Sequence, residues 1–146
     1  MSWKVFEEQS PELAALGLEK LNRTICYLSL LDNEGVPRIH PITPFIGGGR
    51  LFMFTEPTSP KIGDLRRDGR YAIHSAVTRD GPLIEFLVTG EAERITDPTL
   101  RAQAVQIASS PVVSDDYALF EFHVGRVLVV TYDEEKKKIV HRWHSD

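Results

Sequence analysis

The sequence has too little of several features to belong to some large classes of protein. It holds one cysteine in 146 residues, Cys26, so no disulfide can form within the chain and a zinc site built on several cysteines is excluded. Cys26 lies in an apolar run, and we expect a buried, unreactive thiol there. No apolar run is long enough to cross a membrane as a helix, and the first residues lack the apolar core of a signal peptide. A cytoplasmic protein is the resulting expectation.

The chain also lacks an excess of positive charge. Its 17 basic residues are outnumbered by 21 acidic ones, for a formal net charge of −4 at pH 7. Such a balance does not favour a protein that binds nucleic acids or anionic membranes in general. With 42% apolar and 26% charged residues, the composition is that of an ordinary globular protein. We expect one domain over residues 1–146.

Motifs of several enzyme classes are missing as well. The triplet 47–49, three glycines, lies between two predicted strands and matches neither a Rossmann fingerprint nor a phosphate-binding P-loop. Ser29 has no nucleophile-elbow context. The histidines at 40, 74 and 123 fall in three different predicted strands, so no metal site is predicted from them.

What remains is a pattern of strands joined by turns, with a few capped helices. Ser10 and Pro11 predict the start of a helix that runs to about Asn22. Further helices are predicted over about 60–67 and 99–109, and 110–116 reads as a polar loop. Strands are predicted over about 25–31, 38–46, 50–55, 70–77, 83–95, 117–132 and 138–144. Six or seven strands with about three helices favour a mainly β or α+β domain, an antiparallel barrel over about 25–143 with helices packed on it.

Two strands contain residues that disturb a regular ladder. The predicted strand 38–46 carries Pro41 and Pro44, which have no N–H to donate. It is therefore either an edge strand or a strand that faces something other than a neighbouring strand. Gly90, within 83–95, predicts a bulge or a close approach of another part of the chain.

The stretch 51–65 carries the strongest hint of a binding site. A strand ends at Thr55, and a short helix then begins with Ser59 as its N-cap, Pro60 as its first residue and Lys61 just inside. Hydroxyl groups, a positive charge and the positive end of a helix dipole are the groups that bind an anion, and especially a phosphate. An ordinary capped turn with a solvated lysine is the alternative, and this stretch alone favours it.

The order of these pieces resembles the FMN-binding split β-barrel proteins, the pyridoxamine 5′-phosphate oxidase-like family. The resemblance extends from about Ile25 to Trp143. Three pieces carry it: the hairpin 30–44, the stretch 51–72 around the short helix, and the strand 86–95 leading to the capped helix at Asp97 and Pro98.

The resemblance implies a homodimer that binds FMN at the subunit interface and acts as an oxidoreductase on a small molecule. The flavin ring would lie on the second strand, at Arg38, Ile39, His40, Pro41, Ile42 and Thr43. Its phosphate would lie at Thr55, Ser59 and Lys61. His40 is the best candidate for a catalytic residue, because a histidine near a flavin could stabilise the reduced ring or donate to a substrate.

Two features of the sequence leave alternatives open. The family often has an arginine directly before the lysine, where this chain has Pro60, and we expect Arg38, Arg66 or Arg67 to compensate. Arg142 and Trp143 are interpreted as contacts to the cofactor from the other subunit. The alternative is a final strand with Val140 and Trp143 packed inward and with His141 and His144 exposed. For the whole protein, the alternatives are a deazaflavin-dependent reductase of the same fold and a non-catalytic flavin-binding module.

Overall fold

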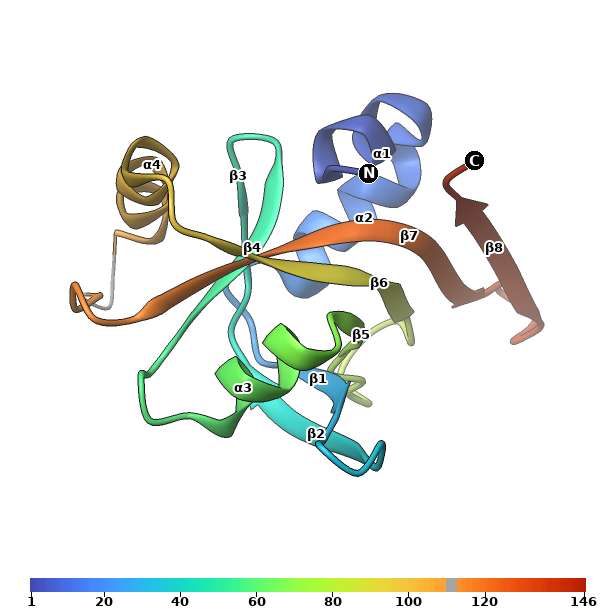
Figure 1. The fold of residues 1–146 in the computed structure, drawn as a ribbon. Helices are drawn as coiled ribbons and strands as arrows, with labels where there is room; N and C mark the ends of the chain where they lie inside the picture. Colours follow the sequence, from blue (N-terminus) through green and yellow to red (C-terminus); the bar gives the residue numbers. More distant parts are fainter. Residues whose placement is uncertain (110–112) are drawn as a thin grey trace.

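The computed structural model describes residues 1–109 and 113–146, which form four helices and eight strands (Figure 1). The helices are α1 (Trp3–Gln9), α2 (Pro11–Leu21), α3 (Pro60–Arg67) and α4 (Pro98–Ala108). The strands are β1 (Cys26–Leu31), β2 (Pro37–Ile42), β3 (Phe45–Gly47), β4 (Arg50–Thr55), β5 (Arg70–Ser75), β6 (Glu85–Ile95), β7 (Ala118–Tyr132) and β8 (Lys138–His144). In the loop expected over 110–116, residues 110–112 lie outside the described residues.

All eight strands join one antiparallel sheet in the order β2-β1-β5-β6-β7-β4-β3, with β8 paired to β7. The prediction of a mainly β, antiparallel fold with flanking helices is therefore confirmed. The predicted numbers of six or seven strands and three helices are too low. Strand β7 is the centre of the sheet, since it pairs with β6, β4 and β8.

The helix that the sequence did not predict is α1. It spans only seven residues, with Ser2 at its N-cap accepting a hydrogen bond from the N–H of Val5. Its buried apolar side chains, Trp3 and Phe6, are one turn apart and belong to the main core. A stripe of two residues is too short for a periodicity to be recognised, and tertiary packing supplies the stability of this helix.

The predicted strand 38–46 is wrong as a single strand. The chain leaves the ladder after Ile42, and Phe45 starts β3 at the opposite end of the strand order. Pro44 lies at the break, where it has no N–H to offer and its carbonyl accepts from the N–H of Arg23 at 2.8 Å. The part with Pro41 is β2, an edge of the sheet, which is one of the two places expected for a strand with a missing donor.

The bulge predicted at Gly90 is confirmed. The register between β6 and β7 shifts between Thr89 and Gly90. A Cβ at Gly90 would lie 2.0 Å from the carbonyl oxygen of His123 and 3.0 Å from the nitrogen of Gly125. The two backbones therefore approach each other here as only a glycine permits.

The main core lies between the sheet and the two N-terminal helices, with a smaller cluster under α4. Cys26 is fully buried in the main core, as expected, and burial raises the pKa of its thiol to about 12. Such a thiol carries almost no thiolate at neutral pH. No helix in residues 1–109 and 113–146 has the length and apolar character to cross a membrane.

The outward face of the sheet carries a row of paired residues across six strands. Paired residues in neighbouring strands share a face. The row runs through Pro41, Tyr27, His74, Leu87, Leu128 and Arg142. Tyr27 is 45% exposed, and Ile39 on the same face of β2 is 70% exposed. Four of the six residues in this row are apolar, and the other two are His74 and Arg142.

Candidate functional site

A hollow of about 550 Å³ opens where β4 ends and α3 begins. Its walls come from the end of β2, the end of β4, the connection 56–59 and the residue before β7. Five of the predicted site residues line this hollow, and they come from two segments that the fold brings together. Pro41, Ile42 and Thr43 belong to one segment, and Thr55 and Ser59 belong to the other. Lys61 lines it too. A volume of this size is in the range of small-molecule sites.

The start of α3 presents side chains, rather than backbone N–H groups, to this hollow. Ser59 caps the helix as predicted, its Oγ accepting from the N–H of Lys61 at 3.3 Å. The N–H of Ile62 donates to the carbonyl of Ser59, and Pro60 has no N–H. The hydroxyl proton of Ser59 is still available to donate, because the cap uses only its oxygen. An anion here would be held by hydroxyls and by the Lys61 ammonium.

Lys61 is a half-buried cation with charges of both signs near it. Burial lowers its pKa, as does the positive charge of Arg38, while Glu56 acts in the opposite direction. Within the described ranges, Lys61 has no ion pair of its own, whereas other lysines do. A bound anion would relieve the cost of keeping this charge out of water.

Asp64, one turn further along α3, holds two of the three arginines that were expected to compensate for Pro60. Its carboxylate is only 5% exposed and accepts from Arg38 at 3.2 Å and from Arg67 at 3.1 Å. Arg38 therefore ties β2 to α3 and does not line the hollow. Arg66 is exposed and has no ion pair among the residues that the structure describes.

His40 is not among the residues that line the hollow. It is on the same face of β2 as Arg38, since alternate residues of a strand share a face. Its Nε2 is buried and has no hydrogen-bond partner in the described chain. Burial lowers the pKa of His40, and the positive charges of Lys61 and Arg38 lower it further. The negative charge of Asp64 acts in the opposite direction and raises it. The imidazole is therefore neutral at pH 7, and its catalytic role stays a prediction.

The lowered pKa of His40 predicts a pH dependence of stability. The unfolded imidazole has a pKa near 6.5, above that of the folded state, so protonation favours unfolding. Stability present above about pH 6.5 should be lost as pH falls through the folded pKa. We expect His40→Gln to reduce the drop in the urea midpoint between pH 7 and 5.5. His144→Gln, at an exposed histidine, is the control and should keep the drop of the parent; an equal drop in both variants would contradict this assignment.

The remaining predicted residues separate into two groups. Ile39 lies exposed on the outward sheet face and does not line the hollow. Arg142 lies on that same outward face, paired with Leu128. Trp143 instead packs inward on Phe6, with ring centroids 4.9 Å apart, and its Nε1 donates to Gln9 at 3.1 Å. Arg142 and Trp143 thus point to opposite faces of β8, and only Arg142 faces a region that another subunit could reach.

Sequence reasoning missed several residues of the hollow. Met53, Phe54, Glu56 and Thr58 line it, and so does Tyr117 from the far side of the β4–β7 pairing. The first four adjoin the predicted motif, and their proximity was the available signal. Tyr117 follows two aspartates in a polar loop, where no local pattern indicates a site.

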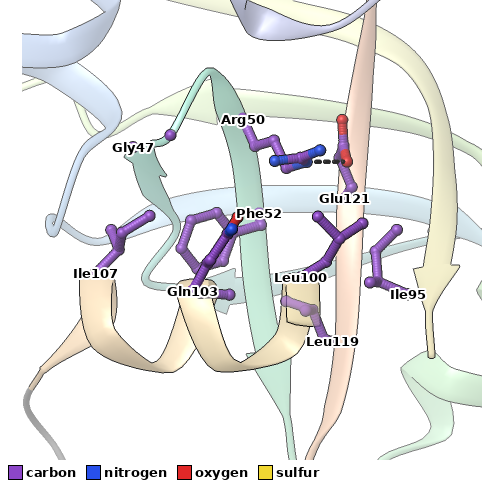
Figure 2. A pocket seen from close by; sticks show the side chains of 11 residues that line it. Gly47, Arg50, Phe52, Ile95, Leu100, Gln103, Ile107, Leu119 and Glu121 are labelled. Carbon is purple, nitrogen blue, oxygen red and sulfur yellow. Dashed lines mark hydrogen bonds and ion pairs between the residues drawn. The ribbon is translucent and has the colours of Figure 1, made fainter. Parts of the chain in front are cut away.

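A second hollow, between α4 and the β3–β4 hairpin, is a packing gap (Figure 2). Its volume is about 20 Å³, room for about one water molecule. Figure 2 shows Arg50 and Glu121 joined by an ion pair above apolar side chains such as Phe52 and Leu100; the pair measures 3.0 Å. Gly47 lets α4 approach, because a Cβ there would lie 2.7 Å from Ile107.

The histidines do not converge on a metal. The Nε2 of His123 lies 2.7 Å from a carboxylate oxygen of Glu93, and His74 contacts the carbonyl of Ser75. Over residues 1–109 and 113–146, no group of three or more His, Cys, Asp or Glu side chains could hold a metal ion.

Comparison with known proteins identifies the family of this chain and shows which solved structures share its fold. The family model described as pyridoxamine 5′-phosphate oxidase matches residues 12–137, which is most of the chain. No curated protein matches the sequence.

Solved structures share the fold at low sequence identity. A heme binding protein from Mycobacterium smegmatis is 22% identical with a TM-score of 0.61; the match covers 82% of this chain but only 53% of that one, so this chain spans about half its length. A NimC/NimA family protein from Clostridium acetobutylicum is 18% identical with a TM-score of 0.62, covering 87% and 92% of the two chains. An F420 reductase is 14% identical with a TM-score of 0.59, covering 75% and 94%. These likenesses confirm the predicted split-barrel fold.

Proposed function

From the premise that the chain belongs to the pyridoxamine 5′-phosphate oxidase family, we propose that it is an FMN-dependent oxidoreductase acting on a small molecule. One observation carries the proposal: the hollow at the start of α3 combines several hydroxyls, the uncharged residues Pro41, Ile42 and Thr43, and a cation that has no ion pair among the described residues. A flavin mononucleotide has an anionic phosphate and a planar ring system, and this combination suits both. When bound, the flavin would supply hydride transfer.

The chain's own residues would bind and orient the cofactor. Lys61, Ser59 and Thr55 would hold the phosphate by charge-assisted hydrogen bonds. Pro41, Ile42 and Thr43 would support the ring. The buried Nε2 of His40, which has no hydrogen-bond partner among the described residues, fits a site that is completed by a ligand or an ordered water.

We also propose that the protein works as a homodimer. The outward sheet face exposes the large apolar side chains of Tyr27 and Ile39, and exposed apolar surface of this kind favours a protein interface. Arg142 lies on the same sheet face, so in such a dimer its side chain would face the partner subunit. Sedimentation equilibrium tests the dimer, since a mass of 16.5 kDa would exclude it.

A deazaflavin-dependent reductase is the second candidate. It is favoured by Arg66, an exposed arginine on α3 without an ion pair in the described part of the chain, which suits an anionic cofactor tail. The similar fold of an F420 reductase supports the same candidate. A non-catalytic flavin-binding module is the third, because flavin chemistry needs no obligatory catalytic side chain that would mark an enzyme.

A pair of titrations decides between these candidates. Cofactor-free protein is titrated with FMN by flavin fluorescence, and in parallel with the deazaflavin. Saturation with one FMN per subunit, followed by substrate-dependent reduction and reoxidation, supports the oxidoreductase. Preference for the deazaflavin supports the reductase. FMN binding with no turnover of any candidate substrate supports the binding module, and binding of neither cofactor overturns all three.

A further inference from the structure

One arginine fixes the segment that leads into β7. Arg101, in α4, donates from its Nη1 to the carbonyl of Tyr117 at 2.6 Å. Its Nη2 donates to the carbonyls of Ser114 and Asp115 at 3.1 and 3.2 Å. The guanidinium also lies over the ring of Phe54, 5.5 Å from its centroid. A single side chain therefore joins α4, β4 and the approach to β7.

Among the described residues, the segment 114–117 makes few other hydrogen bonds. Ser114, Asp115 and Asp116 are exposed, and one backbone hydrogen bond, from the N–H of Tyr117 to Ser114 at 3.1 Å, closes their turn. A guanidinium has several donors in a rigid plane and can satisfy several carbonyls at once, which the single ammonium of a lysine does less well. The position of Tyr117 thus depends on Arg101.

Tyr117 also belongs to the lining of the proposed site. It lines the hollow together with Phe54, which Arg101 covers, and with Ser59 and Lys61. It directly precedes Ala118, which pairs with Thr55 at the end of the β4–β7 ladder. An aromatic residue thus lines the same hollow as Ser59 and Lys61, although it is 56 residues from Lys61 in sequence.

We propose that Tyr117 is a binding residue, whose ring packs against the planar part of the bound cofactor, and that Arg101 is the positioning residue that holds it there. This inference rests on the proposed function and deepens it, because it adds Tyr117 to the residues that would contact the cofactor. Stacking on an aromatic side chain is favourable for any flat ring system and needs no matched hydrogen bonds.

The test is a double-mutant cycle read by FMN titration. Tyr117→Ala should weaken FMN binding about tenfold, while Tyr117→Phe should bind as the parent does. Arg101→Gln should weaken binding by a similar factor, but by less than about twofold in the Tyr117→Ala background, because the two residues act as a unit. Arg94→Gln, at an exposed arginine of β6, is the matched control and should change nothing. Equal effects of Arg101→Gln in both backgrounds, or parent-like binding by Tyr117→Ala, would overturn the proposal.

Hydrogen exchange of the ligand-free protein gives a readout that does not need the cofactor. Arg101→Gln should accelerate exchange of the amide of Tyr117, and Arg94→Gln should not. If the parent protein binds no flavin, the proposed function fails, and this exchange alone judges the positioning role. Unchanged exchange in Arg101→Gln would refute that role.

Discussion

Replacing Lys61 with alanine should weaken FMN binding tenfold to a hundredfold without unfolding the protein. Lys61 is the cation that lines the hollow, and it has no ion pair in residues 1–109 and 113–146. A hydrogen bond to a charged group contributes about 1.5–3 kcal/mol, which corresponds to that range in affinity. Because Pro60 supplies neither a cation nor an N–H, a larger share of the phosphate binding depends on Lys61 than in a site with an adjacent arginine.

The measurement is a fluorescence titration of the variant and of two controls. Lys138→Ala removes an exposed lysine at the start of β8 and should leave the affinity unchanged. Lys61→Arg keeps the charge and should retain most of the binding. Ser59→Ala should weaken binding too, but it also removes the α3 cap, at a cost of about 1 kcal/mol in stability, so its melting temperature must be measured beside it. Parent-like affinity in both Lys61→Ala and Ser59→Ala would refute the phosphate assignment.

Replacing Gly90 with alanine should lower the free energy of unfolding by about 3 kcal/mol. The added Cβ would lie 2.0 Å from the carbonyl oxygen of His123 and 3.0 Å from the nitrogen of Gly125. These are backbone atoms of β7, so no side-chain rotation can relieve the clash. The ladder between β6 and β7 must open at the bulge, and it is the longest pairing of the sheet.

Urea unfolding followed by circular dichroism measures this effect. Gly63→Ala is the matched control, since nothing lies within 4 Å of its added Cβ and Gly63 is inside α3. Alanine is the better helix former by about 1 kcal/mol, so Gly63→Ala should raise the midpoint slightly. A Gly90→Ala midpoint equal to that of the parent would show that the two strands are not in close contact at this point.

The features of the fold that could be predicted are those that depend on a few consecutive residues. Ser59 with Pro60, and Asp97 with Pro98, each mark a helix start within two positions, and both helices begin there. The order of strands in the sheet cannot be read this way. The break at Pro44 illustrates the reason, because β2 and β3 lie next to each other in sequence and at opposite ends of the sheet.

The same division applies to the candidate site. Thr55, Ser59 and Lys61 could be predicted because one strand-to-helix turn contains them all. Tyr117 joins them only through the pairing of β4 with β7, which no local pattern indicates. His40 and Arg38 were placed in the site by resemblance, while the pleat of β2 turns them toward α3 and the buried carboxylate of Asp64.

The central position of β7 has a consequence for how the protein is made. On the ribosome the chain emerges from its N-terminus, so β4 and β6 are complete long before residues 118–132, which pair with both. Until then each has an unpaired edge that is open to wrong partners. Contacts of such large sequence separation also form slowly. We therefore expect the nascent chain to become protease-resistant only after Tyr132 has left the exit tunnel, when β7 can join the two halves of the sheet.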